Sequence, residues 1–152
     1  MQKAANNTID PRAYDPLIQE GFIRQTDLVK AIQESLHKST NLEGLLIEKY
    51  RVPKAVLGKT LSTFFDCPYI PYDERTLIDP QLLNNLSHDY LRRHHWLPLK
   101  QQGDILDVLI DNPHDLDRGH DIRRSFPGLT IRYALGLQRD IERFLSATIG
   151  DA

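Results

Sequence analysis

The chain of 152 residues contains a single cysteine, Cys67, so no disulfide can form within it. No apolar run approaches the roughly 20 residues that a membrane-spanning helix needs. The stretch from Met1 to Asp10 lacks the apolar segment of a secretory signal peptide. The net charge is -2, which gives no overall attraction to nucleic acid or to an anionic membrane. These absences favour a cytoplasmic protein that neither binds nucleic acid nor inserts into a membrane.

Three kinds of catalytic or metal site are incomplete. Gly58-Lys59-Thr60 resembles the end of a P-loop, but Pro53 stands where the first glycine belongs and the surrounding pattern predicts a helix. The G-x-S-x-G motif of serine hydrolases does not occur. The acidic and histidine residues of 111–121 fit a turn and a helix N-terminus better than a metal site. We therefore predict no catalytic residue, no metal site and no enzyme activity in this chain.

The most informative feature that is present is an internal repeat of 29 residues. Five apolar positions keep the same spacing in both copies: Leu17, Ile18, Ile23, Leu28 and Ile32, then Leu46, Ile47, Val52, Leu57 and Leu61. Each copy predicts a short helix, a tight turn and a longer amphipathic helix. In the first copy, one apolar face of the longer helix is expected to hold Leu28, Ala31, Ile32 and Leu36.

The second half of the chain has a different pattern. Residues 67–72 contain two prolines, Pro68 and Pro71, which predicts an extended segment there. Further elements are predicted in the order helix, helix, strand, strand, helix, strand, helix: 80–86, 87–94, 96–100, 105–110, 115–125, 130–135 and 138–148. The predicted fold class is α+β, with a helical subdomain built from the two-copy repeat and then a ββαβα subdomain with a small three-stranded sheet. The predicted boundaries are a flexible tail at 1–10, the helical repeat at 11–66 and the α+β subdomain at 67–152.

Three short motifs occur in order along the second half, followed by a terminal helix: Ile78-Asp79-Pro80-x-Leu82-Leu83, Leu97-Pro98-Leu99, Val108-x-Ile110-Asp111-Asn112-Pro113-x-Asp115-Leu116, and Asp140-Ile141-Glu142-Arg143. Their order and spacing resemble the N-terminal domain of type II secretion and type IV pilus-assembly ATPases. The resemblance covers about residues 12–149. It implies a non-catalytic adaptor or regulatory domain, with an ATPase motor domain downstream. It also implies docking to the cytoplasmic domain of an inner-membrane secretion or pilus protein, which would recruit the motor to the inner-membrane face.

In this family the first half can bind cyclic di-GMP through two copies of a motif separated by five residues, a spacing that Arg12–Ser35 and Asn41–Phe64 retain. Several polar positions differ from the family pattern, since Tyr50 stands opposite Gly21 and both terminal glutamines are absent. No obligatory cofactor is predicted. The resemblance implies an alternative function as a cyclic di-GMP sensor, with these ligand positions: Arg12, Leu17, Ile18, Gly21, Leu46 and Ile47.

Two basic runs leave a choice open. Residues 92–95 and Arg123-Arg124 fit either a solvated helix face or a docking patch for an acidic partner. We expect the helical subdomain to present an apolar and basic surface to the docking partner. We expect the ββαβα subdomain to connect to the motor.

Overall fold

A computed structural model describes residues 9–150 of the chain. These residues form two compact units, one ending at Phe64 and the other beginning at Phe65. Residues 1–8, most of the predicted tail, lie outside the described part. Asp10 is described, and its carboxylate accepts a hydrogen bond of 3.0 Å from the Arg12 N–H, which caps the first turn of helix.

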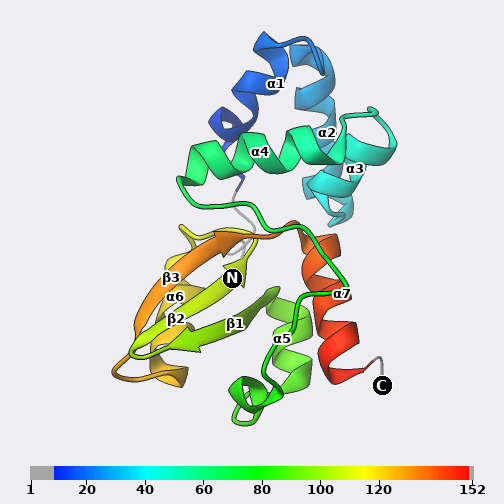
Figure 1. Ribbon diagram of the computed structural model, residues 1–152. Coiled ribbons are helices and arrows are strands. Elements are labelled where there is room, and N and C mark those ends of the chain that lie inside the picture. The colour runs from blue at the N-terminus through cyan, green and yellow to red at the C-terminus, as the bar shows by residue number, and fades with distance from the viewer. Residues whose placement is uncertain (1–8, 151–152) are drawn as a thin grey trace. The chain divides into compact units, whose positions relative to one another are not determined.

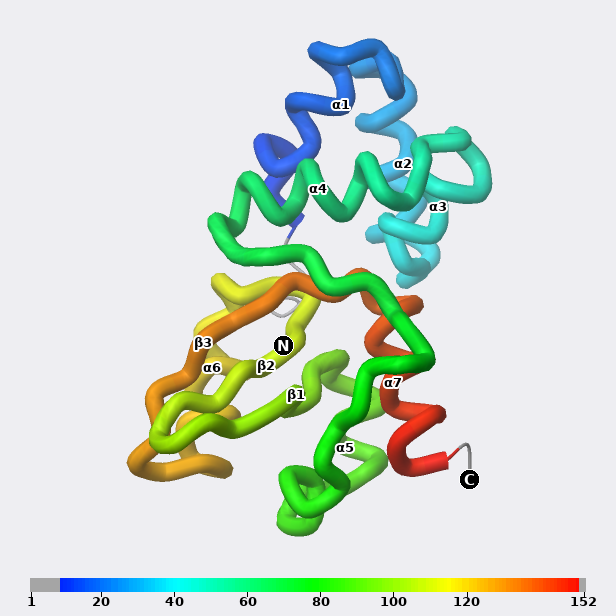
Figure 2. Tube along the Cα trace, in the orientation of Figure 1, coloured from blue at the N-terminus to red at the C-terminus, as the bar shows by residue number. Residues whose placement is uncertain are grey.

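The first unit consists of two successive helix–turn–helix copies (Figures 1 and 2). Its elements are a 3₁₀ turn Pro11–Tyr14, α1 Asp15–Gln19, α2 Gln25–Lys38, α3 Leu42–Glu48 and α4 Lys54–Phe65. A shift of 29 residues carries the end of α1 onto the end of α3, and the start of α2 onto the start of α4. The turns repeat as well, because the N–H of Ile23 donates to the Leu17 carbonyl and that of Val52 to the Leu46 carbonyl. The sequence repeat is therefore a structural repeat.

Most of the repeated apolar residues form the core of this unit. Leu17, Leu46 and Leu57 have no exposed surface, and Ile23, Leu28, Val52 and Leu61 are also buried. The remaining three positions, Ile18, Ile32 and Ile47, are half-buried. Burying a leucine side chain stabilises a fold by about 1.5–3 kcal/mol. The retained apolar positions are thus explained by packing within each copy.

The predicted apolar face of α2 is wrong at one position. Leu36 is 57% exposed, whereas the neighbouring Ser35 is buried. The hydroxyl of Ser35 donates a hydrogen bond of 2.5 Å to the Thr40 carbonyl, which satisfies the buried polar group. Because a helix turns by about 100° per residue, Ser35 lies on the side of Leu28, and Leu36 is rotated away from that side.

The second unit contains a sheet and three α-helices in its described part. Its elements are a 3₁₀ turn Pro80–Leu83, α5 His88–His94, β1 Trp96–Gln102, β2 Ile105–Ile110, α6 Leu116–Ser125, β3 Thr130–Leu135 and α7 Gln138–Ile149. Strand β1 pairs antiparallel with β2, and β2 pairs parallel with β3. Helix α6 connects the two parallel strands and covers one face of the sheet (Figure 1). The predicted α+β class and the ββαβα order are confirmed.

The ends of these helices follow from local side chains. Helix α5 begins after Ser87, whose hydroxyl oxygen accepts a hydrogen bond from the Tyr90 N–H. Helix α6 begins after Asp115, whose carboxylate accepts hydrogen bonds from the N–H groups of Asp117 and Arg118. The segment at 67–72 is extended as predicted, and it pairs with the end of β3 through hydrogen bonds that the Ile70 and Leu135 N–H groups donate. Trp96 lies fully buried at the start of β1 in the core of this unit.

Candidate functional site

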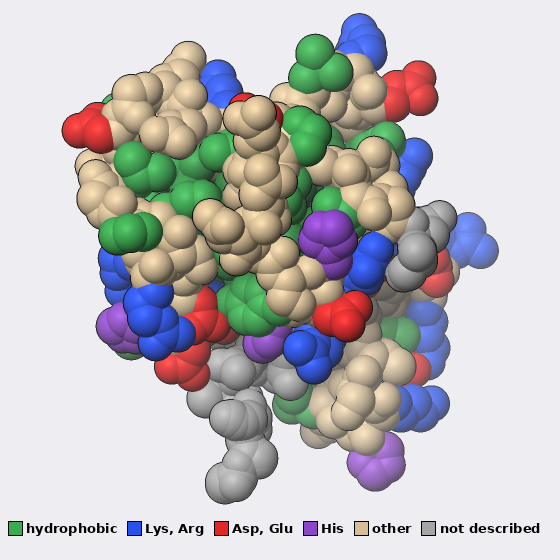
Figure 3. All heavy atoms as spheres, turned by 90° about the horizontal axis from the view of Figure 1, so that it is seen from below, with side chains coloured by type: hydrophobic (Ala, Val, Ile, Leu, Met, Phe, Trp, Pro, Cys, Tyr) green, Lys and Arg blue, Asp and Glu red, His purple; other side chains and the backbone are tan. Residues whose placement is uncertain are grey.

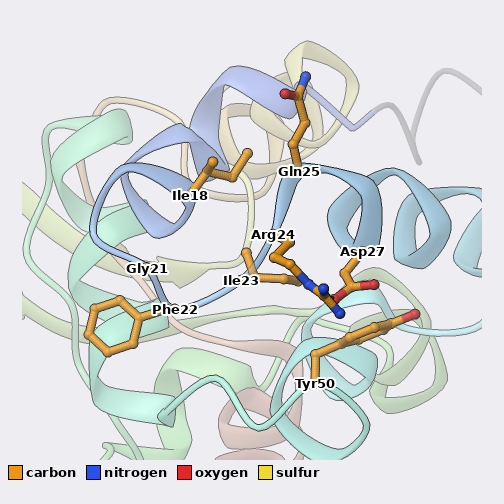
Figure 4. Close-up of a pocket in the computed structure, with 8 residues that line it drawn as sticks. All are labelled: Ile18, Gly21, Phe22, Ile23, Arg24, Gln25, Asp27 and Tyr50. Atoms are coloured by element: carbon orange, nitrogen blue, oxygen red, sulfur yellow. The ribbon is translucent and has the colours of Figure 1, made fainter.

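A groove of about 460 Å³ lies at the turn between α1 and α2 (Figure 4). It is lined by Ile18, Gly21, Phe22, Ile23, Arg24, Gln25, Asp27 and Tyr50. Gly21 and Tyr50 are counterparts under the 29-residue shift, so the groove brings equivalent positions of the two copies together. The spacing of the repeat relates these two residues, but only the structure shows that both line one groove.

The two halves of the groove differ in their backbone and in their bulk. Gly21 has a φ of +82°, and no described atom lies within 4 Å of the place that a Cβ would occupy. This glycine therefore leaves open space beside a backbone conformation that other residues adopt with strain. In the second copy the left-handed residue is Arg51, at φ +60°, and the Tyr50 side chain contributes to the lining.

The charged groups of the groove partly oppose each other. Arg24 is the N-cap of α2, where no described side chain caps the helix, and a free helix N-terminus attracts anions. The Nε of Arg24 lies 3.4 Å from a carboxylate oxygen of Asp27, which reduces the positive charge there. Figure 4 shows the Arg24 side chain extending toward Asp27 and Tyr50, while the ring of Phe22 points away from them. The groove thus offers aromatic and apolar surface together with a partly neutralised cation.

Only two of the six predicted ligand positions line this groove, namely Ile18 and Gly21. Leu17 and Leu46 are fully buried in the core, and Ile47 is half-buried. The role of these residues as ligand contacts stays a prediction.

The sixth position, Arg12, is exposed and already paired. Its guanidinium binds both carboxylate oxygens of Asp10, at 3.0 Å and 2.7 Å. The hydrogen bond and charge of Asp10 raise the pKa of Arg12. A phosphate would have to compete with this carboxylate for the same donors.

A second surface lies on α2. Val29 and Leu36 are 46% and 57% exposed and lie seven residues apart on α2, and the half-buried Ile32 lies between them on the same side of the helix. We call the row formed by Val29, Ile32 and Leu36 the α2 stripe. Lys30 and His37 are exposed directly after the two exposed members of the row. Sequence reasoning assigned Leu36 to the core and missed this stripe, although the spacing of seven could have revealed it.

A buried ion-pair cluster joins three elements of the second unit. Arg118 is 7% exposed, and its Nη1 lies 2.6 Å from Asp111 Oδ1 while its Nε lies 2.8 Å from Asp115 Oδ2. The same Nη1 donates a hydrogen bond of 2.6 Å to the His94 carbonyl at the end of α5. Burial alone would lower the pKa of Arg118, but the two carboxylates outweigh it and raise the pKa.

This cluster explains part of the sequence pattern that had suggested capping or metal binding. Asp111 follows β2, Asp115 caps α6, and both bind the same guanidinium. Sequence reasoning missed Arg118, although its position three residues after Asp115 was a usable signal. The described residues hold no group of three or more His, Cys, Asp or Glu side chains placed to bind a metal ion.

Tyr90 connects the first basic run to the core. Its hydroxyl donates to Asp121 at 2.8 Å and accepts from the indole of Trp96 at 3.0 Å, and its ring stacks on His94. Burial, chiefly, raises the pKa of Tyr90 to about 12. Arg92 also donates to the Gly150 carbonyl and His95 contacts Glu142, so three residues of the run 92–95 have partners within the unit. On the face shown in Figure 3, acidic and basic side chains both lie around the hydrophobic ones.

The order of a two-copy helical unit and a ββαβα unit defines the class to which this chain belongs, the non-catalytic N-terminal domains of secretion and pilus-assembly ATPases. The chain belongs to the MshEN domain family, whose model matches residues 65–152. The match covers the second unit and confirms the family that the motifs there predict.

Individual relatives agree with this assignment. Type II secretion system protein E of Xanthomonas campestris pv. campestris is 27% identical over 146 residues, which cover 93% of this chain and 25% of that protein. The chain thus spans about a quarter of the length of this relative. No helix in the described part of the chain has the length and apolarity needed to cross a membrane.

Two solved structures share the fold. The structure of MshE with cdg superposes with a TM-score of 0.68 at 20% identity, covering 88% of this chain and 96% of that one. The N-terminal domain of XpsE superposes with a TM-score of 0.61 at 24% identity, covering 97% of each chain. At these identities the likeness establishes the fold alone.

Proposed function

We propose that this domain is an adaptor that docks the ATPase motor of a secretion or pilus-assembly system to the cytoplasmic domain of an inner-membrane protein. The observation that carries the proposal is the α2 stripe. Single exposed apolar side chains are ordinary on a protein surface, but Val29, Ile32 and Leu36 follow one another along one side of a helix and together offer an apolar contact surface. Lys30 and His37 beside the row give the apolar and basic character expected of a docking surface.

The family gives this surface a biological setting. ATPases of this class work with inner-membrane components, and their N-terminal domains lie outside the catalytic motor. A domain without catalytic residues contributes to such a system by placing the motor at the membrane. The proposed partners of the domain are thus the ATPase motor and the cytoplasmic domain of the inner-membrane protein.

The docking proposal predicts direct binding to the cytoplasmic domain of the inner-membrane protein from the same secretion or pilus system. Isothermal titration calorimetry of the two purified domains is expected to give a saturable complex with a Kd of about micromolar or tighter, typical of a small specific interface. The corresponding domain from an unrelated secretion system is the control and is expected to bind much more weakly. Absence of binding to the cognate domain would overturn the proposal.

A second candidate function is binding of cyclic di-GMP, favoured by the groove in which Gly21 and Tyr50 meet. Guanine faces bind aromatic and apolar surface, and phosphates bind guanidinium groups and free backbone N–H groups. The open space at Gly21 and the uncapped start of α2 fit these needs in the first copy. The groove suits the phosphates less well elsewhere, because Tyr50 stands where a glycine in the second copy would allow close backbone approach and the Asp27 carboxylate partly neutralises Arg24. This favours the adaptor as the main function. A related MshE structure contains cdg, which supports testing this ligand here.

If the two repeats bind cyclic di-GMP with Arg24 in the groove and Arg12 as a further ligand contact, calorimetric titration is expected to show saturable binding. Arg12→Ala and Arg24→Ala are each expected to weaken it about tenfold, since hydrogen bonds to charged groups contribute about 1.5–3 kcal/mol. Arg75→Ala is a matched control, because Arg75 binds Asp73 in the second unit through the same pattern of contacts that joins Arg12 to Asp10. No heat at high ligand concentration would exclude this second function and leave the docking proposal intact.

A further inference from the structure

We propose that the α2 stripe receives an amphipathic helix of the docking partner, and that this helix carries acidic residues beside its apolar row. The inference rests on the proposed docking function and specifies the surface and the chemistry of the contact.

The geometry of the stripe fits a helix. Val29 and Leu36 lie two turns apart on α2, a rise of about 10 Å, and the half-buried Ile32 lies between them on the same side. Apolar residues at positions i, i+3, i+4 and i+7 of a partner helix present a row of matching length. Two helices pack through apolar rows of this kind, because the side chains of one helix enter the gaps between side chains of the other.

The acidic and basic residues of α2 lie on different sides of the helix. Its two acidic residues, Asp27 and Glu34, lie away from the stripe and are each engaged, Asp27 by Arg24 and Glu34 by Lys49 at 2.9 Å. The hydrogen bond from Lys49 chiefly lowers the pKa of Glu34, so this carboxylate stays ionised and paired.

Beside the stripe the free charge is positive. Lys30 is exposed and forms no ion pair with any residue in the range 9–150. The imidazole of His37, which can donate a hydrogen bond, lies two helical turns further along the same side. Lys38 must share Glu34 with Lys49, so this end of the helix also carries excess positive charge. A partner helix with Asp or Glu beside its apolar row therefore finds complementary charge.

The same charges disfavour two other occupants. In a symmetric pair of this chain, the stripe of one copy would face the identical stripe, and the exposed Lys30 ammonium groups of both copies would lie beside one interface. A membrane surface is disfavoured by the small apolar area, since interfacial helices bury a broad apolar face and display several basic residues. Only three partly exposed apolar side chains form the stripe.

The test replaces the apolar members of the stripe with aspartate and measures binding to the cytoplasmic domain of the cognate inner-membrane protein. Val29→Asp and Leu36→Asp are each expected to weaken the complex by about tenfold or more, because a charge replaces an apolar contact and repels the acidic partner. Leu77→Asp and Leu116→Asp are matched controls in the second unit, where these leucines are 90% and 74% exposed. Both controls are expected to bind like the wild type.

The charge requirement is tested separately. Lys30→Glu is expected to weaken the complex by about fivefold at low salt and by less at high salt, because salt screens an exposed charge. Lys59→Glu, an exposed lysine on α4, is the matched control and is expected to bind like the wild type. All of the replaced side chains are exposed, so the variants are expected to melt near the wild-type temperature.

The outcomes separate this inference from the docking function. Cognate binding that Val29→Asp and Leu36→Asp leave intact would overturn the inference and retain the adaptor. Absence of wild-type binding would overturn both. Light scattering that shows a dimer lost in Val29→Asp would identify a second copy as the occupant. Sedimentation of the wild type with vesicles containing phosphatidylserine, lost in the same variant, would identify a membrane. Each of these last two results would overturn the acidic helix.

Discussion

Replacing Arg118 with methionine is expected to lower the free energy of unfolding by about 3–5 kcal/mol, the usual cost of removing one partner from a buried ion pair. Methionine keeps much of the volume of the arginine side chain but none of its charge. The carboxylates of Asp111 and Asp115, whose side chains are 10% and 6% exposed, would then remain buried without their cation. The His94 carbonyl would also lose its donor.

Chemical denaturation of the wild type and the variant, followed by circular dichroism, measures this loss. Arg124→Met is a matched control on the same helix, because Arg124 also pairs with an aspartate three residues earlier, Asp121, but is 76% exposed. This exposed pair is expected to contribute no more than about 1 kcal/mol. A similar small loss in both variants would contradict the structural role of the Arg118 cluster.

The Arg118 cluster also explains why one of the motifs that identify the family is informative. Asp111 and Asp115 belong to that motif, and their carboxylates fix the end of β2 and the start of α6 around one guanidinium. The third contact of the guanidinium reaches the end of α5. A short acidic motif thus sets the positions of three elements, which connects a local sequence pattern to the fold of the whole second unit.

The sequence predicted the fold because the fold depends on features that are local in the chain. The apolar spacing of the repeat determines both helix–turn–helix copies, and turns such as Asp111-Asn112-Pro113 separate the later elements. Burial around a helix was harder to predict. Ser35 and Leu36 lie on adjacent sides of α2, and residue type alone favoured burial of the leucine. The hydrogen bond from Ser35 to the Thr40 carbonyl, which makes burial of the serine favourable, depends on how the chain turns after the helix.

The candidate sites were predicted less completely, because they depend on contacts that sequence order does not give. The repeat relates Gly21 to Tyr50, but their common groove depends on how the two copies pack. Arg118 contacts a carbonyl 24 residues away. An aliphatic residue in the repeat can either pack in the core or contact a ligand, and its position in the sequence does not distinguish the two roles. The burial of each side chain, which the structure gives, does distinguish them.

Leu46 and Ile47, two neighbouring positions of the second copy, allow core packing and ligand contact to be distinguished by measurement. Leu46→Ala is expected to lower the free energy of unfolding by about 3 kcal/mol, since this side chain has no exposed surface and its removal leaves a cavity in the core. Ile47→Ala removes a side chain of similar size from a half-buried position, and its expected cost is about 1 kcal/mol. Denaturation curves of the two variants measure both losses.

The same pair of variants then reports on ligand binding. At temperatures where both variants stay folded, Ile47→Ala is expected to change the affinity for any ligand of the repeat more than Leu46→Ala does, because only Ile47 has surface that a ligand can touch. Equal losses of stability would contradict the placement of Leu46 in the core. An affinity that falls only in Leu46→Ala would mean that a ligand reaches the interior of the repeat, which requires the two copies to separate on binding.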